Sequence, residues 1–252
     1  MVASQADLPN RYWDALADAA SAHAIMLRDL ATIDDGYLAS ILGAIEQARG
    51  SEVARMALAL MAALFDERVD AHTAPGALGA AQLGRGQTDL AATAGRLILR
   101  DRLLAVLPEV LKLREAIEEF VSSHSVTLMQ SSVHAVPAQA TTLGHTVAPL
   151  LAALERGTSA LLAAFDEINR LPIGAGLGSG TGFTIDRDRV AELLGMSGWI
   201  EQSLDAVAGV DWMLGLANGL ERIATPITRW LDELLALMRA NPDTFTLDES
   251  WQ

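Results

Sequence analysis

Two short stretches of the sequence contain residue types whose spacing could serve chemistry. In residues 129–145, a single histidine, His134, stands five residues before Gln139 in a polar break between two long helical patterns. Histidine exchanges a proton near neutral pH, so His134 is a candidate general acid. The second stretch, residues 172–187, reads PIGAGLGSGTGFTIDR and contains too many glycines for a helix. A lone histidine in a turn is more often structural than catalytic, so these stretches need further context.

A third candidate stretch, GRGQTDLAAT, covers residues 84–93. A helix is expected to begin here, because Thr88 and Asp89 can satisfy free N–H groups in its first turn. Free N–H groups at a helix N-terminus, with Arg85 beside them, also form a natural site for a carboxylate. An ordinary helix cap explains the same residues, so both interpretations stay open on these residues alone.

Long helices are expected to position these stretches. Apolar residues recur at helical spacing over residues 88–129, 142–169 and 203–238. The first helix would be roughly 60 Å long. Proline removes a helical hydrogen bond, so we expect a bend at Pro108 and an interruption near Pro226.

Shorter helical patterns cover residues 12–30, 34–49, 51–65 and 186–198, and we find no strong strand pattern. The long helices need neighbours along their whole surface, which predicts bundling, most simply between subunits. The sequence therefore predicts an all-α fold with two parts. Residues 1–86 would form a small N-terminal helical domain, and residues 87–252 a long-helix bundle domain.

The composition excludes several classes of function. The net charge of −14 argues against nucleic acid as a partner, because an acidic chain repels phosphate backbones. No apolar run is long enough for a bilayer, and the first residues lack the pattern of a signal peptide. We therefore expect a cytoplasmic protein without membrane contact. Cysteine is absent, and no histidines and carboxylates have metal-ligand spacing, so we expect no metal and no cofactor.

The candidate stretches resemble signature segments of the argininosuccinate lyases, within the fumarase/aspartase superfamily. Residues 84–89 resemble the family pattern Gly-Arg-Ser-Arg-Asn-Asp, and residues 133–145 resemble Thr-His-Leu-Gln-Pro/Arg-Ala-Gln-Pro-Thr-Thr-x-Gly-His. Residues 172–187 give the most specific match, to Pro-Leu-Gly-Ala-Gly-Ala-Leu-Ala-Gly-Thr-x-Phe-Pro-Ile-Asp-Arg. Residues 202–212 resemble another family segment, and His72 matches a family Asp-x-His more weakly.

This resemblance implies a carbon–nitrogen lyase that releases fumarate or an analogue from an N-substituted, aspartate-like carboxylate by β-elimination. His134 would stand on the leaving-group side, as general acid or as a link to it. The residues that the resemblance assigns to substrate binding are Arg85, Asp89, His72, Gln139 and Arg187. Among the family positions that differ, Gly86, Thr88 and Val133 replace a serine, an asparagine and a threonine. Since polar contacts enforce selectivity, these changes argue against argininosuccinate itself as the substrate.

A further family signature, Gly-Ser-Ser-x-Met-Pro-x-Lys-x-Asn, has no counterpart in these 252 residues. In the family its serine removes the proton next to a carboxylate, and its lysine and asparagine hold that carboxylate. The dianionic transition state needs such preorganised donors, so the chain alone is expected to be a poor eliminase. We expect a homo-oligomer, or a hetero-oligomer with a complementary lyase chain that supplies the loop. The alternatives are an enzyme repurposed for other chemistry and a non-catalytic scaffold or regulatory homologue.

Overall fold

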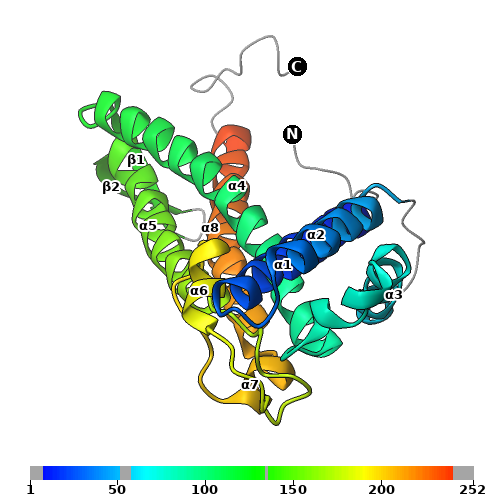
Figure 1. The fold of residues 1–252 in the computed structure, drawn as a ribbon. Coiled ribbons are helices and arrows are strands. Elements are labelled where there is room, and N and C mark those ends of the chain that lie inside the picture. Colours follow the sequence, from blue (N-terminus) through cyan, green and yellow to red (C-terminus); the bar gives the residue numbers. More distant parts are fainter. Residues whose placement is uncertain (1–7, 52–57, 134–135, 241–252) are drawn as a thin grey trace. The chain divides into compact units, whose positions relative to one another are not determined.

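The protein is described here by a computed structural model that covers residues 8–51, 58–133 and 136–240 (Figure 1). The chain divides into two compact units. Unit 1 comprises Met1–Arg102 and Phe165–Trp212, and unit 2 comprises Leu103–Ala164 and Met213–Gln252. The predicted domain boundary between residues 86 and 87 falls inside unit 1 and stays a prediction.

Unit 1 contains the N-terminal helices and the loops that carry most of the candidate residues. Its complete helices are α1 (Leu8–Asp29), α2 (Asp35–Arg49), α3 (Leu58–His72), α6 (Arg187–Leu193) and α7 (Ser203–Ala208), with short 3-10 turns at Pro75–Ala77 and Ala80–Gln82. Three longer helices contribute residues to both units: α4 (Gln87–Ser123), α5 (Leu143–Ile168) and α8 (Asp211–Ala240).

The core of unit 1 is built around aromatic side chains and a run of alanines. The rings of Trp13 and Phe65 meet edge to face, with centroids 5.2 Å apart. Trp13 Nε1 donates a hydrogen bond to Ala48 O, so the buried indole N–H is satisfied. All alanines of α1 are buried, and their small size allows neighbouring helices to pack closely against this helix.

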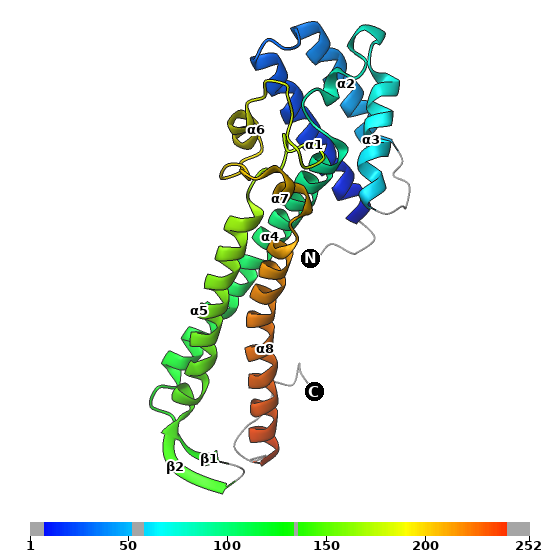
Figure 2. The same cartoon turned by 90° about the horizontal axis from the view of Figure 1, so that it is seen from below.

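Unit 2 consists of the long helices and one hairpin (Figure 2). Helices α5 and α8 approach closely at Gly157 and Gly219. A Cβ atom at Gly157 would lie 2.6 Å from Ile223 Cδ1, and one at Gly219 would lie 2.8 Å from Leu161 Cδ2. Strands β1 (Leu128–Val133) and β2 (Val136–Thr142) pair antiparallel, with an irregularity between Gln130 and Ser132.

The all-α fold predicted from the sequence is confirmed, with the hairpin as a small addition. The helix predicted over residues 88–129 ends earlier, at Ser123, and β1 follows it. The predicted interruption near Pro226 is wrong, because α8 continues through this residue. The break lies instead at Gly209, where a Cβ atom would meet Asp205 O at 2.7 Å.

One helix corrects the expectation that no segment could span a bilayer. By length and composition alone, α5 is long and apolar enough to cross a membrane. The core helix of a soluble protein has the same character, and Leu154 and Leu161 of α5 are fully buried within unit 2. This pattern is therefore weak evidence for membrane contact.

Candidate functional site

Arg85 lies just before α4 and forms a buried, bidentate ion pair with Asp66 of α3. Its Nη2 and Nη1 atoms lie 2.7 and 3.2 Å from the two carboxylate oxygens of Asp66. Its Nε donates to Ala81 O at 3.1 Å. The side chains are 0% and 3% exposed, so the charge of Arg85 is balanced within unit 1. A direct role of Arg85 in substrate binding stays a prediction.

Asp89, in the first turn of α4, connects this region to the glycine-rich loop, residues 172–187. Its Oδ1 accepts a hydrogen bond from Gly86 N, and its Oδ2 accepts from Gly174 N and Gly176 N at 3.0 and 2.8 Å. Complete burial raises the pKa of Asp89 above the usual carboxyl value, and the three N–H groups and the positive charge of Arg85 oppose this shift. The second and third candidate stretches, residues 172–187 and 84–93, therefore meet at one carboxylate.

Arg187 begins α6 and holds the carbonyl side of the same loop. Its Nε donates to Ile173 O at 2.8 Å, and its Nη2 donates to Leu171 O and Pro172 O at 3.3 and 3.2 Å. The guanidinium lies 4.5 Å from the ring centroid of Trp199, a cation–π contact. Burial lowers the pKa of Arg187, while the negative charge of Asp89 opposes this shift.

Glycines allow the loop to lie against the start of α4. Gly84 has a φ of +76°, and a Cβ atom there would lie 2.7 Å from Ile185 Cγ2. A Cβ atom at Gly86 would lie 3.2 Å from the carbonyl carbon of Gly176. Gly86, which replaces the serine of the family pattern, thus lies where backbone approaches backbone.

Replacing Gly84 by alanine is expected to lower the free energy of unfolding by about 1–3 kcal/mol, through backbone strain and overpacking. Urea unfolding measures this change. Gly43→Ala in α2 is the matched control, because no atom lies within 4 Å of its added Cβ. That variant should stabilise the helix slightly, and equal effects at both positions would contradict the close approach at Gly84.

The other predicted residues lie elsewhere. His72 is exposed at the end of α3 in unit 1. Gln139 is exposed on β2 in unit 2, where its carbonyl accepts a hydrogen bond from Ser131 Oγ at 2.7 Å. His134 lies outside the described residues. The structure thus brings Arg85, Asp89 and Arg187 together within unit 1.

Asp66 was missed in the sequence, although a signal for it existed. It lies on the side of α3 that carries the buried residues Ala62, Phe65 and Val69. An acidic residue on an apolar face needs a buried partner, because an unpaired buried charge is costly.

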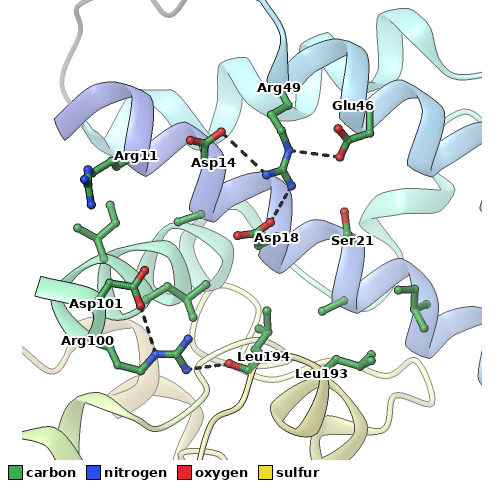
Figure 3. A pocket seen from close by; sticks show the side chains of 15 residues that line it. Arg11, Asp14, Asp18, Ser21, Glu46, Arg49, Arg100, Asp101, Leu193 and Leu194 are labelled. Carbon is green, nitrogen blue, oxygen red and sulfur yellow. Dashed lines mark hydrogen bonds and ion pairs between the residues drawn. The ribbon is translucent and has the colours of Figure 1, made fainter. Parts of the chain in front are cut away.

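A separate cavity of unit 1, with a volume of about 840 Å³, is lined by residues of α1, α2 and α4 and by Leu193 and Leu194 (Figure 3). Its charged side chains largely pair with one another. Arg49 lies among Asp14, Asp18 and Glu46, with its closest oxygen, Asp18 Oδ1, at 2.7 Å. None of the predicted site residues within the described ranges lines it. The described residues also contain no group of three histidines or carboxylates placed to hold a metal ion.

Comparison with known proteins gives a consistent set of relatives. A family model described as lyase matches residues 38–248. The argininosuccinate lyase of Methanosarcina mazei is 31% identical over 232 residues, covering 91% of this chain and 47% of the relative. That of Natronomonas pharaonis is 32% identical over 229 residues, covering 87% of this chain and 45% of the relative. The chain spans about half the length of the curated relatives it matches.

Solved structures agree with this fold. The crystal structure of EDDS lyase in complex with formate is 27% identical, with a TM-score of 0.83, and the match covers 93% of this chain and 47% of that one. A variant of EDDS lyase with bound fumarate has a TM-score of 0.82, covering 91% of this chain and 46% of that one. A class II fumarase from Schistosoma mansoni, 16% identical with a TM-score of 0.77, is similar in fold; its match covers 94% of this chain and 58% of the fumarase.

Proposed function

We propose that this chain, which belongs to the fumarase/aspartase superfamily of lyases, forms part of a carbon–nitrogen lyase that releases fumarate or an analogue. The observation that carries most weight is the contact of two signature segments at Asp89, whose carboxylate joins residues 84–89 to the loop at Gly174 and Gly176. Relatives that act on argininosuccinate, and a lyase structure with bound fumarate, support the same class of reaction.

In the proposed reaction, a base removes the proton from the carbon next to a substrate carboxylate, and the carbon–nitrogen bond breaks. His134 supplies the proton that leaves with the nitrogen, or links the nitrogen to its donor. The base belongs to the family loop that has no counterpart in these 252 residues, and either a further segment or a complementary lyase chain would supply it. Gly86, Thr88 and Val133 favour an N-substituted aspartate other than argininosuccinate.

Assembly with further chains is part of this proposal. Gln139 belongs to unit 2, whereas Arg85, Asp89 and Arg187 belong to unit 1. The family resemblance implies active sites built from several subunits, so one copy need not supply all of these groups to the same site. An apolar groove of about 280 Å³ in unit 2, lined by residues of α4, α5 and α8 that include Phe120, Trp230 and Leu231, gives such assembly a surface to bury. The cytoplasmic location stays a prediction.

Replacing His134 by asparagine is expected to abolish fumarate release, because the leaving nitrogen would lose its proton source. The assay uses the complex purified through a tag on this chain in its own host, with fumarate followed by its absorbance and an N-substituted aspartate as substrate. His124→Asn is the matched control, since His124 lies outside the candidate stretches, is half-buried and contacts Thr127. Unchanged turnover in the His134 variant would overturn the proposed role. A wild-type complex that never releases fumarate would favour a scaffold instead.

A further inference from the structure

Charges of alternating sign run through unit 1 from α3 to the glycine-rich loop, buried at Asp66, Arg85 and Asp89 and half-buried at Arg187. Asp66 pairs with Arg85 at 2.7 Å, and Asp89 interacts electrostatically with both Arg85 and Arg187. We propose that Asp89 and Arg187 are positioning residues, which fix the glycine-rich loop and act on substrate through that loop rather than by touching it. This inference rests on the proposed function only for its effect on substrate binding.

The carboxylate of Asp89 is already occupied by three backbone N–H groups and is closed to solvent. Both of its oxygens accept N–H groups, one from Gly86 and the other from Gly174 and Gly176. The residue is 0% exposed. A substrate carboxylate brought next to Asp89 would be repelled by its negative charge. Asp89 is therefore suited to hold backbone and unsuited to hold an acidic substrate.

Arg187 also binds the backbone of the loop, but it donates to carbonyl oxygens, whereas Asp89 accepts from N–H groups. It donates to the carbonyl oxygens of Leu171, Pro172 and Ile173, and its guanidinium stacks on Trp199. Trp199 is itself anchored, because its Nε1 donates to Asp188 at 3.1 Å. The carbonyl side of residues 171–173 thus faces a cation, while the N–H groups of Gly174 and Gly176 face an anion.

The contacts of Asp89 and Arg187 with residues 171–176 form a clamp on the loop. The loop needs this clamp because its own residues do not enforce its conformation. Gly174 and Gly176 have φ angles of +92° and +61°. Glycine visits this region freely but loses the most conformational entropy when it is fixed there. A side chain at Gly174 would be strained at this φ, and its Cβ atom would lie 2.5 Å from Ile185 Cδ1 and 3.1 Å from Arg187 Nε. Loss of either charged residue should therefore release the same backbone segment.

Two variants that each remove one charge distinguish a positioning role from direct contact with the ligand, because the two roles predict different changes in fumarate affinity. If Asp89 and Arg187 touch an anionic ligand, Asp89→Asn should tighten fumarate binding and Arg187→Gln should weaken it. If both act through the loop, both variants should weaken binding, each by about tenfold or more, because a displaced loop misplaces the groups around the ligand. Isothermal titration of fumarate into the complex purified from its own host measures the two dissociation constants.

Hydrogen exchange tests the clamp without any ligand. In both variants the N–H groups of Gly174 and Gly176 should exchange about tenfold faster or more, while α1 keeps its protection. The control variants are Asp35→Asn, whose side chain is 91% exposed, and Arg189→Gln, on the same helix as Arg187 with surface partners. Neither control should change fumarate binding or loop exchange.

Two results would overturn the proposal: opposite shifts of fumarate affinity in the two variants, or unchanged exchange of the loop in both. A wild-type complex that does not bind fumarate would count against the proposed function, and the exchange experiment would still decide whether the clamp exists.

Discussion

Replacing Arg85 by methionine is expected to lower the free energy of unfolding by about 3–5 kcal/mol, because a buried carboxylate then loses its cation. Asp66 is 2% exposed, and both of its oxygens face the guanidinium of Arg85. Water cannot replace the missing partner without opening the packing around α3. Urea unfolding at pH 7.5, followed by circular dichroism, measures the loss.

A second variant separates the ion pair from general packing. In Asp66→Leu combined with Arg85→Met, no buried charge is left unpaired, so much of the lost stability should return. Recovery stays incomplete because the hydrogen bond from Arg85 Nε to Ala81 O is also lost. The surface pair of Arg229 and Glu233 is the control, since its side chains are 78% and 60% exposed. Arg229→Met should change stability by less than about 1 kcal/mol, and a similarly small loss in Arg85→Met would contradict the buried pair.

The helices were predictable because apolar spacing is a local property of the sequence. Residues 142–169 were predicted as one helix, and α5 covers Leu143–Ile168. Pro226 misled the prediction, because proline costs a helix one hydrogen bond while packing holds α8 together around it. Ile223, three residues before this proline, is buried within unit 2.

The hairpin was missed because its strands lack an alternating apolar pattern. Strand β1 reads LMQSSV, and the described part of β2 is mostly exposed. A buried face gives a strand its period of two, and none of the hairpin residues whose burial is described is buried. The family resemblance identified the residues of this segment without predicting their secondary structure.

For the candidate site, the sequence identified residues but not their partners. Arg85 and Asp89 were found from their spacing in one motif, whereas the partner of Arg85 lies 19 residues earlier and Gly174 lies 85 residues after Asp89. Such pairs depend on how α3 and the loop pack, which a single sequence does not specify. These partners occupy the charged groups of Arg85, Asp89 and Arg187, so a role in substrate binding cannot be assigned from the motif alone.

A buried histidine makes the stability of unit 1 depend on pH. His23 of α1 is 0% exposed, and its Nε2 lies 2.7 Å from Leu83 O, so the neutral ring carries its proton on Nε2. Its Nδ1 has no hydrogen-bond partner among the described residues. Burial, and then the positive charge of Arg85, lower the pKa of His23 from 6.5 to about 3.

Acid destabilises unit 1 because the unfolded chain binds a proton at His23 more readily than the folded chain does. Below pH 6.5 the unfolded chain protonates His23 while the folded chain does not, so stability falls as the pH falls. This loss continues until the pH reaches about 3 and amounts to on the order of 4 kcal/mol. At pH 5.5 the loss should be about 1.4 kcal/mol, and this pH still lies above the isoelectric point near 4.6.

His23→Gln is expected to remove this part of the pH dependence, because glutamine can donate to Leu83 O and does not titrate. Urea unfolding of both proteins at pH 7.5 and 5.5 gives the comparison. The variant should be less stable at pH 7.5, since the glutamine fills the site less well, and the gap should shrink by about 1.4 kcal/mol at pH 5.5. His124→Gln, at a half-buried position in unit 2, is the control, and its pH dependence should match that of the wild type. A gap between wild type and His23→Gln that stays constant with pH would mean that His23 also protonates in the folded protein, which its burial beside Arg85 opposes.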